Sequence, residues 1–409
     1  MKLRKIVKFG MNKLGIKELR RNQIKPINAI LDGHDTMVIA PTSYGKSLIY
    51  QIPAITMKKG ITVVIEPLLA LMHDQVKKLR KHDIAAAYLD STQSKSEQKE
   101  TIEQLRQGEI KMLYLSPERL NKDILSEIEE NNHIGMFVVD ECHCVLDWGN
   151  TFRKAYLSIG KYVGRLKQHP IMVALSATVA TEDRPTIKDL LSMRKAIEFQ
   201  MPLYRSNLCF MKTQVKTRDA QLKELKKYLR KYHKHTTIIF CNTKRAVKAV
   251  AKKSESVKKY RGEVIPYHGE DKTHEKDMMT GQKHIIVATT ALSLGVDIPN
   301  VDLVIHFNMP HSIAEYCQMS GRAGREGQHA RSILLYNPDD NQTNWGMTGE
   351  IKDEEAKRTA RNKLNEMKEF CEDSKRCMVK TMLNALGDEH EGDCRYCTNC
   401  QKKRRKEKK

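Results

Sequence analysis

Residues 136–149 read MFVVDECHCVLDWG, and this stretch decides the fold class of the 409-residue chain. An apolar run ends in two adjacent carboxylates, Asp140 and Glu141, and Trp148 follows a few residues later. A buried strand with acids at its carboxyl end is typical of phosphoryl chemistry at the edge of a parallel sheet. One acid of such a pair holds Mg²⁺, and its neighbour orients the attacking water. The stretch therefore predicts an ATP-hydrolysing site close to an aromatic side chain.

Apolar runs of the same kind recur in two series, with helix-like segments between them. Strands that alternate with helices predict parallel sheets joined by right-handed crossovers. The charge-rich stretch around residues 200–233 suits a linker and an opening helix, and the sequence after about residue 340 is typical of helices. We therefore expect an α/β protein with two tandem domains and a small helical region. The expected strands lie at residues 36–40, 62–67, 111–118, 136–141 and 171–178, and at 236–242, 264–269, 284–290, 302–308 and 332–337.

The formal net charge of +22 indicates a polyanionic partner, and nucleic acid is the leading candidate. A solvated, lysine-rich surface is the alternative, because acidic residues are also plentiful. No segment approaches the ~20 apolar residues of a membrane span, and the basic N-terminus lacks the apolar stretch of a signal peptide. We expect an intracellular protein without membrane contact, in the nucleus of a eukaryote or in the cytoplasm or nucleoid of a bacterium.

A loop that ends in Gly45-Lys46-Ser47 lies between the first expected strand and a helix-like segment. Backbone N–H groups and the helix N-terminus cradle phosphates in such a loop. Lys46 then reaches the β- and γ-phosphate oxygens, and the Ser47 hydroxyl ligates Mg²⁺. The strict pattern has glycine where Ala40 stands, so the motif alone is partial. Its position upstream of the paired acids predicts nucleotide binding.

A second motif, Gln318-Met-Ser-Gly-Arg322-Ala-Gly-Arg325, follows the expected strand at 302–308. If the motif is helical, its two arginines are three positions apart and share one face. Arg325 would then stabilise charge on the γ-phosphoryl group as an arginine finger, with Arg322 beside it. An ordinary salt-bridged surface helix is the alternative, although its glycines would weaken it. The motif predicts an ATP site that is divided between two domains.

Cysteines crowd the C-terminal region with the spacing Cys377-x16-Cys394-x2-Cys397-x2-Cys400. In an intracellular protein this crowding indicates a metal before a disulfide. One ligand from a helix and three from a loop can close a tetrahedral, structural zinc site. A redox disulfide is the alternative, and Cys371, which falls outside the pattern, is expected to serve packing.

Taken together, these motifs resemble the RecQ family of superfamily 2 DNA helicases over roughly residues 14–400. By resemblance, Gln23 hydrogen-bonds the adenine edge and Arg20 packs near the base. The matching motif APTSYGKS assigns nucleotide binding to Thr42, Ser43, Tyr44, Gly45, Lys46 and Ser47. Further matching segments follow in the order of the family, at residues 66–76, 116–120, 140–153, 175–179, 238–243, 287–301 and 318–327.

The resemblance also assigns the residues that couple hydrolysis to DNA. Trp148, Phe152 and Arg153 belong to an aromatic-rich loop peculiar to RecQ proteins, and they would sense single-stranded DNA and report to Glu141. For Trp148 the alternative is a packing role between domains. Ser176 and Thr178 would link hydrolysis to domain movement. The expected catalytic residues are Lys46, Asp140, Glu141, Gln318, Arg322 and Arg325, and the four clustered cysteines match the zinc-binding subdomain of the family.

The implied architecture is two RecA-like domains, at residues 1–205 and 206–340, then a zinc-binding subdomain at 341–401 and a basic disordered tail at 402–409. The implied cofactors are ATP, Mg²⁺ and Zn²⁺, and the implied partners are single-stranded and forked duplex DNA; protein partners are not predicted. The implied activity is an ATP-dependent 3′-to-5′ DNA helicase.

Some positions depart from the family pattern. Ile16 replaces an aromatic residue that stacks on adenine, Glu66 stands where a hydroxyl residue is usual, and we expect no winged-helix or HRDC domain after Cys400. Two rivals stay open: an RNA-directed helicase, because it shares most of the motor motifs, and a DNA-stimulated ATPase or strand-annealing protein with weak unwinding, because the winged helix is not expected. The basic tail suits phosphate contacts, a nuclear-localisation signal or a solvated end.

Overall fold

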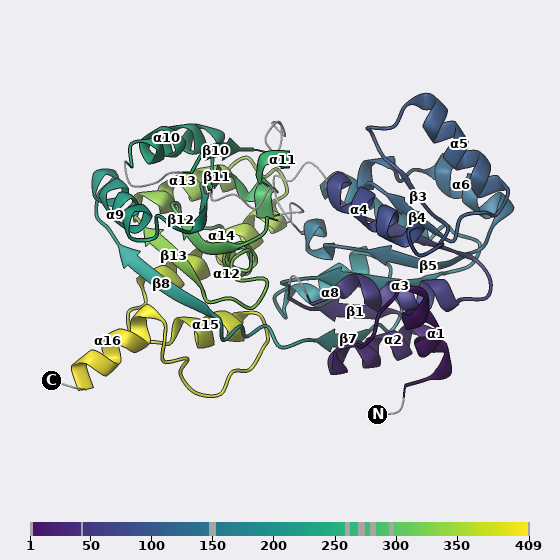
Figure 1. Ribbon diagram of the computed structural model, residues 1–409, viewed down its shortest axis with the longest axis horizontal. Helices are drawn as coiled ribbons and strands as arrows, with labels where there is room; N and C mark the ends of the chain where they lie inside the picture. Colours follow the sequence, from purple (N-terminus) through teal and green to yellow (C-terminus); the bar gives the residue numbers. More distant parts are fainter. Residues whose placement is uncertain are drawn as a thin grey trace. The chain divides into compact units, whose positions relative to one another are not determined.

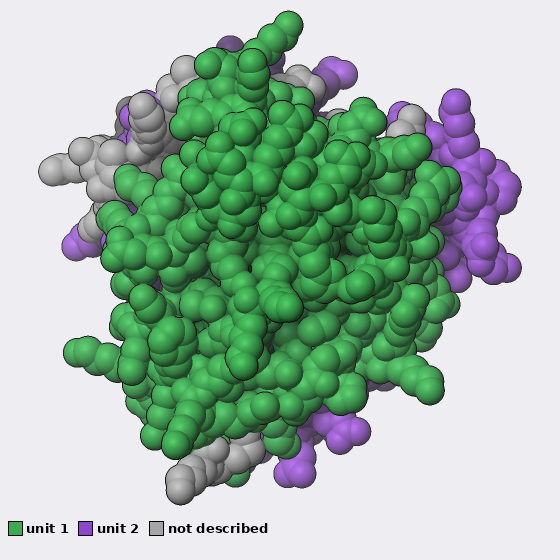
Figure 2. Space-filling model, turned by 90° about the vertical axis from the view of Figure 1, so that its right-hand side faces the viewer, with its two compact units in different colours: residues 1–202 green, residues 203–409 purple. Residues whose placement is uncertain are grey.

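The computed structural model describes residues 3–41, 44–146, 153–257, 262–268, 275–278, 284–293 and 298–407. The chain divides into two compact units, residues 1–202 and 203–409, which Figure 2 distinguishes by colour. Among the residues described, no helix combines the length and the apolar character that crossing a bilayer requires.

Unit 1 contains a seven-stranded sheet in the order β3-β4-β2-β5-β6-β1-β7, in which every described pairing is parallel (Figure 1). Strands β1, β2, β4 and β5 are buried along their whole length, as expected for parallel strands that are covered on both faces. The strands are β1 (Thr36–Ile39), β2 (Ile61–Ile65), β3 (Ala86–Leu89), β4 (Met112–Leu115), β5 (Ile134–Val139), β6 (Ile171–Ser176) and β7 (Ile197–Gln200).

The helices of unit 1 connect these strands, and α1 and α2 both pack against α3. Helix α5 begins at a capping box, because the Ser94 side chain accepts from the Glu97 N–H and the Glu97 carboxylate accepts from the Ser94 N–H. The α-helices are α1 (Lys5–Lys13), α2 (Ile24–Leu31), α3 (Lys46–Thr56), α4 (Leu69–Arg80), α5 (Lys95–Arg106), α6 (Lys122–Asn131), α7 (Arg153–Val163) and α8 (Asp183–Leu190), and the 3₁₀ turns are η1 (Arg21–Gln23), η2 (Pro117–Arg119) and η3 (Cys142–Val145).

Unit 2 contains a six-stranded sheet in the order β10-β11-β9-β12-β13-β8, and its described pairings are also parallel. The strands are β8 (Leu208–Gln214), β9 (Thr236–Phe240), β10 (Val264–Tyr267), β11 (Ile285–Ala288), β12 (Val301–His306) and β13 (Ala330–Tyr336). The helices are α9 (Arg218–Lys231), α10 (Lys244–Glu255), α11 (Glu275–Met278), α12 (Ile313–Ser320), α13 (Asp339–Thr348), α14 (Glu354–Glu372), α15 (Met378–Ala385) and α16 (Thr398–Glu407), with a 3₁₀ turn η4 (Thr290–Ser293).

Both units therefore have the RecA-like parallel-sheet architecture that we expected, followed by a helical C-terminal region. Helices α9, α10 and α12 have N-cap residues, Thr217, Thr243 and Ser312, whose side chains each accept a hydrogen bond from an N–H group of the first helical turn. Helix α14 buries Leu364, Met367 and Phe370, whose three-residue spacing places them on one face.

The stretch at 200–233 is more ordered than a linker. Helix α9 was expected there, but residues 208–214 form β8, an edge strand that pairs with β13. Its sequence, LCFMKTQ, starts with four apolar residues and ends with three polar ones, so its apolar run stops halfway along the strand, unlike those of the central strands. The C-terminal helices cover this edge: the Lys212 N–H donates to Thr398 Oγ1 at 2.8 Å.

The prediction of a disordered tail is wrong for residues 402–407, which continue α16. Lysine, arginine and glutamate have high helix propensity, and cations are favourable near a helix C-terminus. Because the first turn of α16 is held by the cysteine loop, with the Gln401 N–H donating to the Cys397 carbonyl at 2.9 Å, the helix can extend without burying a core of its own. Figure 1 shows α16 as the last element of the chain.

Candidate active site and metal centre

The carboxyl edge of the unit 1 sheet brings together acids from neighbouring strands. Strands β2 and β5 pair with Ile65 opposite Val139. The residues that follow, Glu66 and Asp140, therefore leave the sheet side by side, and the Asp140 N–H donates to the Ile65 carbonyl at 3.0 Å. Both acids are buried. Parallel strands that end at one edge are the usual place for a phosphate site in an α/β fold.

Glu141 adopts a left-handed backbone conformation, with φ 47° and ψ 47°. This conformation is costly for a residue with a side chain, and such strain concentrates at functional positions. Local bonds hold the turn, because the Glu141 N–H donates to Asp140 Oδ1 at 2.9 Å and the Tyr156 hydroxyl donates to the Asp140 carbonyl at 2.9 Å. The paired acids are thus fixed by their own turn and by α7.

The acids of this edge repel one another in a site shielded from water. Burial, together with the charge of Glu141, raises the pKa of Asp140 to about 6, and the charge of Lys46 opposes the rise. Burial and the charges of Asp140 and Glu141 also raise the pKa of Glu66 well above its usual value. Carboxylate oxygens are the ligands that Mg²⁺ prefers, so this edge, which gathers three carboxyl groups, fits a divalent cation.

His143 connects the acids to the end of β6. Its Nδ1 lies 2.9 Å from Ser176 Oγ and 3.3 Å from Glu141 Oε2. Ser176 Oγ in turn accepts from the Thr178 N–H at 3.3 Å, and both residues are buried. The His143 ring therefore lies between Ser176 and Glu141 and contacts both side chains.

The phosphate loop of unit 1 is held by Gln23, which is buried. Gln23 Nε2 donates to the carbonyls of Tyr44 and Gly45, at 3.0 Å each, and its Oε1 accepts from the Arg20 N–H at 2.8 Å. The Arg20 guanidinium lies 4.8 Å from the centre of the Tyr44 ring. Gly45 has φ +79°, and a Cβ there would lie 2.8 Å from Gln23 Nε2. Only glycine allows this close approach without strain.

The loop leads into α3, which begins at Lys46. Lys46 Nζ lies 3.4 Å from the Ala40 carbonyl, at the end of β1. Because Lys46 also acts on the charge of Asp140, the loop and the acids share one edge of the sheet. Residues Thr42 and Ser43 lie outside the described part of the chain, as do Trp148 and Phe152; Arg153 begins α7, but its side chain is not described.

The motif of unit 2 differs from its expected conformation. Helix α12 carries Gln318 and ends at Ser320, so Arg322 and Arg325 lie in the turn that follows. The condition for a shared helical face, a motif that is helical through Arg325, is therefore not met. Gly324, which lies between the two arginines, adopts φ +65°, a left-handed conformation that no helix through both residues could contain.

Two side chains beside β8 hold this turn in place. Asn207 Nδ2 donates to the carbonyls of Gly324 and Gln328, at 2.9 and 2.8 Å, and the Arg205 guanidinium donates to the carbonyls of Gly321 and Gly324. Arg322 is buried and Arg325 is half-buried. Burial, and the charge of Arg325, lower the pKa of Arg205. The turn thus concentrates positive charge, which is the property needed to bind a phosphate.

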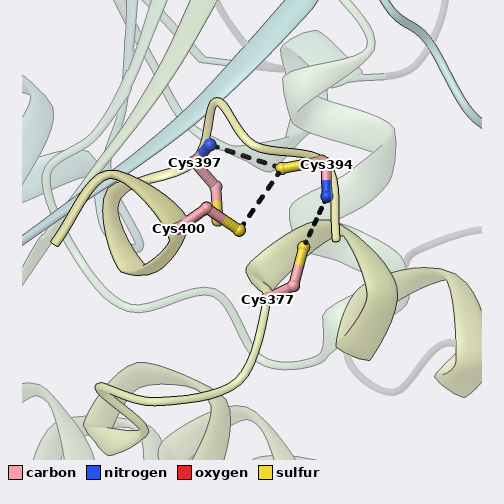
Figure 3. A group of neighbouring side chains, drawn as sticks. All are labelled: Cys377, Cys394, Cys397 and Cys400. Carbon is pink, nitrogen blue, oxygen red and sulfur yellow. Dashed lines mark hydrogen bonds between the residues drawn. The ribbon is translucent and has the colours of Figure 1, made fainter. Parts of the chain in front are cut away.

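The four clustered cysteines of unit 2 could hold a metal ion. Figure 3 shows their side chains, with Cys377 at the start of α15, Cys394 and Cys397 on one loop, and Cys400 in α16. The four Sγ atoms lie within 4.8 Å of one another, and those of Cys394 and Cys400 are 4.0 Å apart. A tetrahedral zinc site with Zn–S bonds of about 2.3 Å has sulfurs about 3.8 Å apart, so the set fits zinc.

Backbone N–H groups of the cysteine loop donate hydrogen bonds to two of these sulfurs. The Cys394 N–H donates to Cys377 Sγ and the Cys397 N–H donates to Cys394 Sγ, both at 3.3 Å. Hydrogen bonds from the thiols of Cys394 and Cys397, and from backbone N–H groups, hold the pKa of Cys377 well below its usual value. These bonds favour the thiolate of Cys377, which is the metal-binding form. Hydrogen bonding with Cys377 and Cys397 raises the pKa of Cys394, and burial raises the pKa of Cys400.

Two side chains of the candidate site were not assigned to it from the sequence. Glu66 was noted from the sequence only as a departure from the family pattern, whereas the structure places it beside Asp140. The signal for its position is the apolar run that leads into Glu66, as the run at 136–139 leads into Asp140. His143, two positions after Glu141, gave no signal of its contact with Ser176, because that contact crosses between strands.

The comparisons with known proteins agree with this geometry. Three family models match: DEAD/DEAH box helicase at residues 20–185, helicase conserved C-terminal domain at 220–327 and RecQ zinc-binding at 338–401. Among solved structures, the DEAD-box helicase Mss116 bound to ssRNA and UDP-BeF has a TM-score of 0.69 at 18% identity, with 94% of this chain and 90% of that chain covered. The DUF1998 helicase MrfA bound to DNA has a TM-score of 0.66 at 21% identity, with 82% and 51% covered. The fold and site define a tandem helicase-domain protein with an attached zinc subdomain.

The curated relatives define the family more narrowly. The ATP-dependent DNA helicase RecQ of Haemophilus influenzae is 30% identical over 394 residues, which cover 94% of this chain and 62% of the relative. The protein of the same name from Bacillus subtilis is 30% identical over 392 residues, which cover 94% and 65%. The chain belongs to the RecQ family. It spans somewhat less than two thirds of the length of these two relatives.

Proposed function

We propose that this chain is an ATP-dependent DNA helicase that translocates on single-stranded DNA with 3′-to-5′ polarity and unwinds duplex DNA. The observation that carries the proposal is the buried edge where Asp140 and Glu141 lie within reach of the charge of Lys46, in a chain of the RecQ family. The four-cysteine cluster supports the RecQ assignment over a general helicase.

In unit 1, ATP would lie on the loop before α3. Lys46 would bind the β- and γ-phosphates, aided by Tyr44 and Gly45 and by Thr42 and Ser43. The adenine would lie near Gln23 and Arg20, whose contacts with the loop would couple base recognition to phosphate binding. Asp140 and Ser47 would hold Mg²⁺, which supplies positive charge to the phosphate oxygens.

Glu141 would position the attacking water and accept its proton, because its side chain is held at the turn that follows β5. Gln318, Arg322 and Arg325 of unit 2 would stabilise negative charge on the transferred phosphoryl group. The bonds from Arg205 and Asn207 keep the turn preorganised, so its charge needs no rearrangement to act.

Coupling to DNA would run through Trp148, Phe152 and Arg153 and through Ser176 and Thr178. The contact between His143 and Ser176 supports a route from the β6 end to Glu141.

The ATP site is tested by the Lys46→Ala variant. We expect a loss of ATP turnover of at least about 100-fold, because the charge that acts on the transferred phosphate is removed, whereas binding of single-stranded DNA without nucleotide should persist. Turnover is measured as phosphate release, and DNA binding as fluorescence anisotropy. Full turnover in this variant would contradict the site assignment.

The nucleic-acid substrate is tested by comparing ATP turnover with DNA and RNA oligonucleotides of matched sequence. We expect stimulation by DNA to exceed stimulation by RNA. Equal or greater stimulation by RNA would favour an RNA-directed helicase, and stimulation by DNA without strand separation would favour a DNA-stimulated ATPase or strand-annealing protein.

A further inference from the structure

A hollow of about 530 Å³ lies beside the zinc cluster, on the side of α16. It is bordered by the cysteine loop, which contributes Asp393, Arg395 and Tyr396, and by α16, which contributes Lys403 and Arg404. These five side chains are exposed. None of them belongs to the helicase motifs, so the ATP site gives no reason for their arrangement.

Tyr396 presents its ring from a fixed backbone. The residue is 62% exposed, which makes it unusual among the large hydrophobic side chains described. Its carbonyl nevertheless accepts from Gln401 Nε2 at 2.7 Å and from Cys209 Sγ at 3.3 Å. Because the backbone is already held, a planar partner could stack on this ring with little loss of conformational entropy.

Arg395 occupies a backbone position that disfavours its own side chain. Its φ is +65°, in the left-handed region that glycine occupies without strain. Its position between two zinc ligands accounts for the turn but not for a long, exposed cation there. Strained backbone positions are concentrated at functional sites, so we infer that the Arg395 side chain has a role in binding.

The facing surface of α16 combines both signs of charge. Lys403, Arg404 and Glu407 share the face that carries Cys400, at the helical spacing of three, four and seven residues. Lys403 Nζ lies 3.6 Å from Asp393 Oδ2 across the hollow. A bare phosphate would meet two carboxylates here. A nucleotide offers a phosphate for the arginines and a flat base for the tyrosine.

We propose that this hollow binds a nucleotide of single-stranded DNA, with one base stacked on Tyr396 and the neighbouring phosphates on Arg395 and Arg404. A duplex is the wrong occupant, because its bases are already stacked and paired. The volume of about 530 Å³ is sufficient for one nucleotide. The hollow belongs to the zinc subdomain, and none of its residues is in the motifs to which we assign ATP hydrolysis. It would give this chain a contact with single-stranded DNA that does not require ATP.

The test is equilibrium binding of a fluorescein-labelled oligothymidylate to the full zinc-loaded chain, without nucleotide. We expect Tyr396→Ala to weaken binding at least about fivefold, the loss of one stacked base, while Tyr396→Phe keeps the wild-type affinity. Arg404→Ala should reduce the slope of log affinity against log salt by about 0.7, the value for one single-strand phosphate contact. Arg405→Ala, on the same helix but not at the hollow, is the matched control and should leave the slope unchanged.

Arg395→Gly separates binding from folding. This variant removes both the side chain and the backbone strain, so we expect weaker DNA binding together with an equal or higher midpoint of thermal unfolding. Tyr396→Trp gives a second readout, because single-stranded DNA should quench the added indole fluorescence and duplex DNA should not.

Unchanged affinity in Tyr396→Ala would overturn the proposal. Equal loss of slope in Arg404→Ala and Arg405→Ala would also overturn it, because it would indicate only diffuse attraction to a basic helix. Binding is measured without ATP, so it does not depend on ATP hydrolysis. A chain that fails to hydrolyse ATP could still bind DNA at the hollow, and the two proposals can therefore fail separately.

Discussion

At the scale of the residue, backbone strain and buried charge are concentrated at the carboxyl edge of the unit 1 sheet, where we expect the ATP site. Glu141 holds a left-handed backbone, and Glu66 and Asp140 lie side by side in a buried edge of the sheet. The left-handed backbone and the repulsion between the buried acids both lower the stability of the free protein. A bound cation would relieve the repulsion between the acids. The active-site edge is therefore expected to limit the stability of unit 1.

Replacing Glu66 by glutamine tests this cost. Burial and the neighbouring acids raise the pKa of Glu66, so its carboxyl is harder to ionise in the folded chain than in the unfolded chain. The penalty is absent below the unfolded pKa and grows as the pH rises towards the folded value. Without divalent cations, Glu66→Gln should stabilise the protein by about 1 kcal/mol or more at pH 8 and lose this gain near pH 4.

The measurement is denaturant unfolding at both pH values, with Glu109→Gln as the control because Glu109 is exposed. If Glu66→Gln is less stable than the wild type at pH 8, Glu66 makes a favourable interaction instead, and the account of the acidic edge is wrong.

At the scale of the element, a buried histidine ties three elements of unit 2 together. His306, on β12, lies with Nε2 3.2 Å from Ser320 Oγ on α12 and 3.2 Å from Ser332 Oγ on β13. Its ring also packs against Tyr316, with centroids 4.7 Å apart. Burial lowers the pKa of His306 to about 3. The imidazole therefore stays neutral in the folded chain, where it serves as a hydrogen-bonding partner.

This lowered pKa predicts an acid-sensitive unit 2. The unfolded chain binds a proton at His306 near pH 6.5 and the folded chain does not, so stability is fully present above pH 6.5 and lost as the pH falls towards 3. Between pH 8 and pH 5 the wild type should lose about 2 kcal/mol more than a His306→Gln variant. Urea unfolding at the two pH values measures the difference, and His329→Gln, at an exposed position, should behave as the wild type. Parallel losses in the wild type and His306→Gln would refute the assignment.

The zinc cluster is the second feature at this scale, because it joins α15, the cysteine loop and α16. Cys397→Ser should abolish stoichiometric zinc binding and lower the stability of the subdomain by several kcal/mol, on the order of the binding energy of a structural zinc. Zinc is measured by chelator release with a metal indicator. Cys371→Ala, a buried cysteine outside the cluster, should keep its zinc. Full zinc content in Cys397→Ser would rule out the four-thiolate site.

At the scale of the whole molecule, sequence reasoning recovered what is repeated or locally encoded. The central strands were recognisable because parallel strands buried on both faces are continuous apolar runs, as in β2 and β5. Strands β3, β7 and β8 were missed. Strand β3 is half alanine, which is uncommon in strands, β7 alternates apolar and polar residues, and only the first four residues of β8 are apolar. The helix at 402–407 was missed because composition alone does not show that the cysteine loop anchors its first turn.

The same distinction applies to the site. Lys46, Asp140 and the four cysteines were predicted from motifs whose spacing encodes their chemistry. The approach of Glu66 to Asp140 depends on the pairing of β2 with β5, and the contact of His143 with Ser176 depends on the pairing of β5 with β6. Strand order in a sheet is a property of the fold and not of any local pattern, so these partners emerged only from the structure.

The central claim, that this chain couples ATP hydrolysis to DNA strand separation, is tested most directly by unwinding two labelled duplexes that differ only in carrying a 3′ or a 5′ single-stranded tail. The proposed helicase predicts ATP-dependent release of the labelled strand from the 3′-tailed duplex, little release from the 5′-tailed duplex, and none from either in the Lys46→Ala variant. Robust DNA-stimulated ATP turnover without strand release, or release that needs no ATP, would contradict the account.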